Sequence, residues 1–122
     1  SGQLVSIDIT SKVGELVEER YADGWSLHII NPKHGAVEMS HVLEKYPETT
    51  LFLHDSDHSG EWQIIEFKAA LKSLTKCSLI AFDDVSNELI DFVRESHPEI
   101  FVIVFDENRK FSAIFLLNRS SE

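Results

Sequence analysis

The sequence predicts an α/β fold, with a mainly parallel sheet covered by helices on both faces and an antiparallel hairpin at its carboxyl end. Three observations carry this prediction. Apolar runs of strand length alternate with amphipathic runs of helical length along the chain. The run I-F-V-I-V-F at residues 100–105 is continuously apolar, which is typical of a strand buried on both faces. A short polar joint at residues 106–110 separates the last two apolar runs and favours a hairpin.

The first half of the chain is expected to form two strand–helix units. Residues 4–9 alternate apolar and polar side chains, which indicates a strand. A helix is expected after this strand, and Gly24 is well placed to end it. Residues 25–30 indicate a second strand. Residues 36–46 indicate a second helix, which Pro47 closes.

The second half continues the alternation and ends in two consecutive strands. Residues spaced three and four apart mark the inner face of each helix. The predicted elements, in order, are strand 49–53, helix 61–74, strand 78–82, helix 87–97, and strands 100–105 and 111–117. The predicted inner stripes are Met39, Val42, Leu43 and Tyr46, then Ile64, Phe67, Leu71 and Leu74, then Leu89, Ile90 and Val93.

Length, charge and cysteine content exclude several classes of protein. The chain has 122 residues, which fits one domain spanning 1–122, with 11 basic and 21 acidic side chains and a formal net charge of −10. This charge argues against binding to nucleic acid or to an anionic membrane surface, because both depend on Lys and Arg. No apolar run approaches the ~20 residues of a membrane span, and no secretory signal is recognisable. Cys77 is the single cysteine, so no internal disulfide can form and a cytoplasmic protein is expected.

Polar residues gather where the predicted parallel strands end, which is the edge at which α/β sheets bind ligands. Asp55, Asp57 and His58 follow one strand, and Asp83 and Asp84 follow the next. Carboxylates that share one edge repel each other unless a cation compensates them, and Mg²⁺ prefers such oxygen ligands. The sequence therefore predicts a divalent-cation or catalytic site here. Helix capping and solvated turns are the commoner use of these residue types.

Other polar side chains have simpler interpretations. His54 alternates within its strand and is expected to be packed or hydrogen-bonded, and Asp84 or Ser86 can cap the next helix. Cys77 precedes a buried strand and is expected to be an inert small hydrophobe. Trp62 flanks the polar clusters, although an aromatic residue near a helix start most often serves packing. Asp8 ends the first strand, where nucleotide-binding sheets place a ribose-binding acid.

Three motifs together resemble those of the class I methyltransferases that use S-adenosylmethionine, above all the small-molecule O-methyltransferases with an I-D-G-D-H-S-Y motif. Residues 53–60 are L-H-D-S-D-H-S-G. Residues 77–84 are C-S-L-I-A-F-D-D, where the family often has G-G-L-I-V-F-D-D. Residues 2–8 are G-Q-L-V-S-I-D, similar to the family's second strand, G-x-V-x-x-I-D. Order and spacing agree over essentially the whole chain, and the resemblance implies a three-layer, Rossmann-like methyltransferase sheet.

The resemblance also implies roles for individual residues. Asp8 would hold the ribose hydroxyls of S-adenosylmethionine. The metal ligands would be Asp55, Asp83 and Asp84. The residues that face the acceptor or support the ligands would be Asp57 and His58. A cation such as Mg²⁺ would bind the hydroxyl of a small-molecule acceptor, lower its pKa and orient it toward the methyl group.

The sequence departs from the family at its start. The family begins with a strand, a Gly-rich turn and a helix that cradle the methionine portion of the cofactor, whereas residues 4–9 match the family's second strand. The absent strand normally lies between the strands at 4–9 and 49–53, so its loss would open two strand edges in the sheet. We expect the gap to be closed by direct pairing or by a homo-oligomer with a shared sheet or hydrophobic face. Gly60 also replaces a common aromatic residue.

Two functions therefore remain open at the level of sequence. One is a methyltransferase that acts on a small-molecule hydroxyl with divalent-metal assistance. The alternative is a truncated, catalytically inactive methyltransferase-like domain that serves as a binding or oligomerisation module. A phosphoacceptor receiver domain fits less well, because it expects an acidic pair after the first strand, where only Asp8 stands.

Overall fold

The computed structural model of the chain describes residues 4–8, 25–29, 35–54, 59–107 and 110–117. In chain order the elements are β1 (Leu4–Asp8), β2 (Trp25–Ile29), α1 (Gly35–Glu44), β3 (Leu51–His54), α2 (Gly60–Ser73), β4 (Leu79–Phe82), α3 (Asn87–Ser96), β5 (Phe101–Glu107) and β6 (Lys110–Leu116). Each begins and ends within two residues of its predicted bounds. The helix predicted between β1 and β2 lies outside the described residues.

The described strands form two sheets. β1 and β2 pair in parallel in a two-stranded sheet, while the larger sheet has the order β3-β4-β6-β5. Within it, β3 and β4 are parallel, and β6 runs antiparallel to both β4 and β5. The predicted α/β class and closing hairpin are therefore confirmed. The register of the hairpin extends to its tip, where Glu107 lies opposite Lys110.

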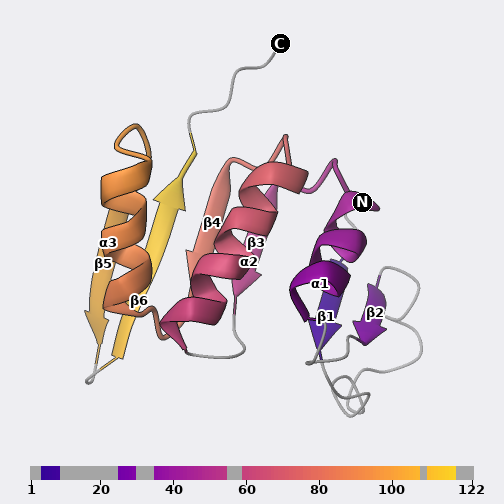
Figure 1. Cartoon of the computed structure of the whole chain (residues 1–122), viewed down its shortest axis with the longest axis horizontal. Coiled ribbons are helices and arrows are strands. Elements are labelled where there is room, and N and C mark those ends of the chain that lie inside the picture. Colours follow the sequence, from indigo (N-terminus) through magenta and orange to yellow (C-terminus); the bar gives the residue numbers. More distant parts are fainter. Residues whose placement is uncertain (1–3, 9–24, 30–34, 55–58, 108–109, 118–122) are drawn as a thin grey trace.

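A break separates β1 from β3. The strands β1 to β4 point the same way, but among the described residues β1 pairs only with β2 and β3 only with β4 (Figure 1). The sequence predicted that a central strand would be missing between these two segments. The option that the flanking strands close the gap by pairing directly with each other is wrong for the described residues, because their ladders do not join.

The three described helices lie on one side of the strands (Figure 1). On that side α2 sends Phe67 against Phe82 of β4 and Phe115 of β6, at ring-centroid distances of 6.4 and 5.1 Å, and all three rings are buried. No described helix covers the opposite side, so the prediction that both faces are covered is not met by the described part of the chain. No described helix has the length and apolar character needed to cross a membrane.

The predicted inner stripes form the core. Met39, Val42 and Leu43 of α1 are buried, as are Leu89, Ile90 and Val93 of α3. In α2, Phe67 is fully buried, and Ile64 and Leu71 are half-buried. Leu74, the residue after the last one of the helix, is also buried. Two polar residues of α2, Gln63 and Glu66, are also buried, which the helical pattern did not predict.

Candidate functional site

The carboxyl ends of β3 and β4 lie side by side. Their register pairs His54 with Phe82, and beyond the last pair the backbone N–H of Asp83 donates to the carbonyl of His54 at 3.0 Å. The parallel pairing of β3 and β4 is therefore confirmed, and the two strands end at one edge of the sheet. Whether the two polar clusters meet there stays a prediction. The other residues predicted here, Asp55, Asp57 and His58, lie outside the described residues.

Asp83 and Asp84 form a half-buried turn after β4. The Asp83 carboxylate accepts a hydrogen bond from the Ser112 hydroxyl of β6 at 3.1 Å. Asp84 has a φ of 54°, in the left-handed region that L-residues other than Asn and Asp rarely adopt. The next residue, Val85, donates its N–H to the carbonyl of Phe111. This turn is therefore held against both the hairpin and the end of β3.

Gln63 of α2 fixes the same turn from the helix side. Its side chain is fully buried. Its amide nitrogen donates to the carbonyl of Asp84 at 3.0 Å, and its amide oxygen accepts from the N–H of Ser86 at 2.8 Å. Sequence reasoning missed this residue. The available signal was its position four residues before Phe67, on the apolar stripe of a helix, where a polar side chain needs a partner.

Two serines begin the helices that flank the site. Ser59 caps α2 by accepting from the N–H of Trp62 at 3.3 Å, and Ser86 caps α3 by accepting from the N–H of Leu89 at 3.2 Å. Of the two caps predicted for α3, Asp84 and Ser86, it is Ser86 that occupies the N-cap position. Each hydroxyl satisfies an N–H of the first helical turn that has no partner within the helix.

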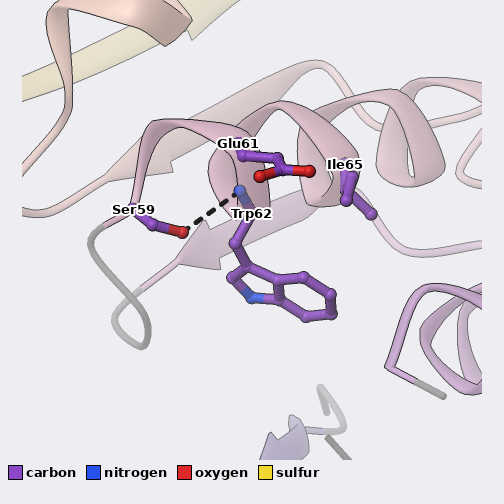
Figure 2. A pocket seen from close by; sticks show the side chains of 4 residues that line it. All are labelled: Ser59, Glu61, Trp62 and Ile65. Atoms are coloured by element: carbon purple, nitrogen blue, oxygen red, sulfur yellow. Dashed lines mark hydrogen bonds between the residues drawn. The ribbon is translucent and has the colours of Figure 1, made fainter. Parts of the chain in front are cut away.

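A hollow of about 270 Å³ opens beside the start of α2. It is lined by Ser59, Glu61, Trp62 and Ile65, and Figure 2 shows the Trp62 indole projecting from the first turn of the helix. The far edge of the indole reaches Gly35 at the start of α1, where an added Cβ would lie 2.6 Å from the ring. Trp62 therefore serves packing between α1 and α2 and also forms a wall of the hollow.

Gly60, at the start of α2, makes a second close contact, with Glu88 of α3. A Cβ placed on it would lie 2.5 Å from the Cδ of Glu88 and 2.8 Å from its Cβ. Glycine here lets α3 approach α2, which gives a packing reason for a glycine at this position.

A buried contact between a histidine and a carboxylate supports the end of β3. The Nε2 of His54 contacts the Glu66 carboxylate of α2, and both side chains are buried. The His54 ring also stacks on Phe82, with ring centroids 4.4 Å apart. The expectation that His54 is a packed or hydrogen-bonded residue is confirmed. Cys77 is likewise buried, with its thiol near the carbonyl of Leu79, as expected for a small core residue.

Two of the three predicted cation ligands lie within the described residues. Asp83 and Asp84 offer carboxylate oxygens, but no group of three or more His, Cys, Asp or Glu residues suited to a metal occurs within the described ranges. Asp8 lies at the carboxyl end of β1, where its backbone pairs with Ile29. The predicted ligand set is therefore complete only if Asp55 joins the two described carboxylates.

Comparisons with protein-family models, curated proteins and solved structures found no match for this chain.

Proposed function

We propose that this chain is a methyltransferase-like domain that uses S-adenosylmethionine, acts on a hydroxyl of a small molecule and is assisted by a divalent cation. The strand order supports the proposal in two respects. The sheet ends in an antiparallel hairpin, as the resemblance implies. The break between β1 and β3 also lies where the resemblance implies that a strand is missing.

One observation carries the proposal furthest, and it is the hydrogen bond between the Asp83 N–H and the His54 carbonyl. It holds together the two chain segments that bear the methyltransferase-like motifs, since Asp55 follows His54 directly in the sequence. The carboxyl ends of β1, β3 and β4 also point one way (Figure 1), and Asp8 is the last residue of β1. Ligands of α/β sheets bind at this side.

The proposed roles follow from the chemistry of the donors. Asp8 binds the ribose of the cofactor, and Asp55, Asp83 and Asp84 supply the oxygen ligands that Mg²⁺ prefers. A cation held by these carboxylates would supply a lowered pKa for the acceptor hydroxyl. For Asp57 and His58 the resemblance implies a role beside the acceptor or in support of the metal ligands. Gln63 is a positioning residue, because it holds the turn that carries Asp84.

Calorimetric titration with S-adenosylmethionine, with and without Mg²⁺, tests this proposal. We expect micromolar binding, and Asp8→Asn should weaken it at least tenfold. Asp83→Asn should weaken the Mg²⁺-dependent part by a similar factor, because asparagine can still accept from Ser112 but lacks the charge. Asp91→Asn, at an exposed position of α3, is the matched control and should change nothing. Absence of binding to the unmodified chain, or equal weakening by all three variants, would reject the proposal.

A further inference from the structure

One face of the larger sheet is apolar and has no helix of the described residues on it. Side chains alternate between the two faces of a strand, and the register shows which residues share a face. We call this surface the bare face, and its residues are Leu51, Leu53, Leu79, Ala81, Phe101, Ile103, Phe105, Ser112, Ile114 and Leu116.

Burial differs between the two faces. On the helix-covered face, Ile80, Phe82 and Phe115 are at most 1% exposed, and the exposed Val104 and Phe111 of this face lie toward the tip of the hairpin. On the bare face no residue is buried, and Leu53 and Phe101 are 66% and 63% exposed. Eight large hydrophobic residues are exposed in the described ranges, and five of them belong to the bare face. Exposure of apolar side chains is therefore concentrated here rather than scattered.

The size of this surface is that of an interface. If a large apolar side chain presents roughly 200 Å² when fully exposed, the five exposed residues together present roughly 500 Å². That is near the upper end of the patches found on monomers, about 300–600 Å². The half-buried members, such as Leu79 and Ile114, add to it. The total approaches the ~800 Å² that each partner contributes to a standard protein interface.

The charge distribution favours a second copy of this chain as the occupant. The chain has a net charge of −10, yet none of the ten bare-face residues is ionisable. Two copies can therefore meet through this face without burying an unpaired charge, the most costly element of an interface. At the hairpin tip the backbone register ends with the pair Glu107 and Lys110, beyond the ten residues of the bare face.

We propose that two copies of this chain form a symmetric dimer by packing their bare faces together, sheet against sheet. Face-to-face sheets pack about 10 Å apart, with their side chains interdigitated. Asp83 lies at the rim of this face through its hydrogen bond with Ser112, so the dimer borders the candidate site. The proposal rests on the register and exposure of the strands and does not depend on methyl transfer.

Sedimentation velocity across a wide range of protein concentrations tests the dimer. The unmodified chain should sediment as a dimer that dissociates on dilution. Leu53→Lys and Phe101→Lys should each weaken dimerisation at least tenfold, because each places a charge within the apolar contact. Val37→Lys is the matched control, because Val37 is 59% exposed on α1 and lies outside the bare face. It should leave the dimer intact.

Circular dichroism establishes that each variant is folded before its mass is compared. If a lysine variant fails to fold, Phe101→Ser replaces it, since serine removes the apolar contact without adding a charge. A monomer at every concentration would overturn the proposal, as would polydisperse aggregates or equal weakening by Val37→Lys. A dimer that survives both bare-face substitutions would also overturn it.

Discussion

Replacing Gln63 by leucine should loosen the turn that carries Asp83 and Asp84. Leucine has a similar volume and fits a fully buried site on the inner side of α2. It cannot replace the hydrogen bonds of 3.0 and 2.8 Å that join α2 to the carbonyl of Asp84 and the N–H of Ser86. The substitution therefore removes two contacts and leaves their backbone partners without the side chain that satisfied them.

The structure gives the size of the effect. A buried backbone group that loses its partner costs about 1–3 kcal/mol, and two such groups are involved. The added apolar surface of leucine offsets part of this cost, so we expect a net loss of about 2–4 kcal/mol in the free energy of unfolding. That is a large part of the ~5–15 kcal/mol by which a domain of this kind is stable.

Urea-induced unfolding, followed by circular dichroism and by tryptophan fluorescence, measures this loss. Lys72→Leu is the matched control, because it introduces the same side chain at an exposed position of the same helix. It should change the free energy of unfolding by no more than about 0.5 kcal/mol. If Gln63→Leu were no more destabilising than Lys72→Leu, the reasoning that Gln63 holds the turn would be refuted.

Three further substitutions test separate features of the fold by the same unfolding measurement. Glu66→Leu should cost about 1–3 kcal/mol because it leaves buried His54 without the carboxylate that contacts it. The double variant with His54→Phe should cost much less, and equal costs would contradict the coupling. Asp84→Gly should raise the free energy of unfolding by up to about 1 kcal/mol, because glycine adopts a φ of 54° without strain. A lower free energy of unfolding would mean that the Asp84 carboxylate contributes to folding. Gly60→Ala should lower the free energy of unfolding by about 1–3 kcal/mol, because the added Cβ overpacks against Glu88. Adding Glu88→Ala should recover only part of this loss, since the contact with the Cβ of residue 88 remains. Full recovery would contradict the close approach of the two helix backbones.

The order of strands and helices was predictable because the spacing of apolar residues differs between strands and helices and can be read from the sequence. The stripe of Leu89, Ile90 and Val93 marked the inner face of α3, and all three are buried. The hairpin followed from a polar joint between two apolar runs, and β5 and β6 pair as expected. The pattern of apolar residues could not reveal which face of the sheet the helices cover, because a strand residue can be apolar whether or not a helix packs against it. Leu53 is such a residue, apolar and 66% exposed.

The candidate site was predictable only where local sequence carries the signal. Asp83 follows a clear strand, so its place at the sheet edge followed from parallel pairing. Gln63 and Glu66 were missed because their partners, Asp84, Ser86 and His54, are distant in sequence and become neighbours only through tertiary packing. Burial of a polar helical residue is decided by such partners, which the period of the helix does not encode.

The most direct test is to locate the cofactor by two-dimensional ¹H–¹⁵N NMR during titration with S-adenosylmethionine in the presence of Mg²⁺. The proposed function predicts that amide shift changes concentrate at Asp8, His54, Asp83 and Asp84, with smaller changes at Ser86 beside Gln63. Shift changes confined to the bare face, or no changes at saturating cofactor, would contradict a cofactor site at the carboxyl ends of β1, β3 and β4.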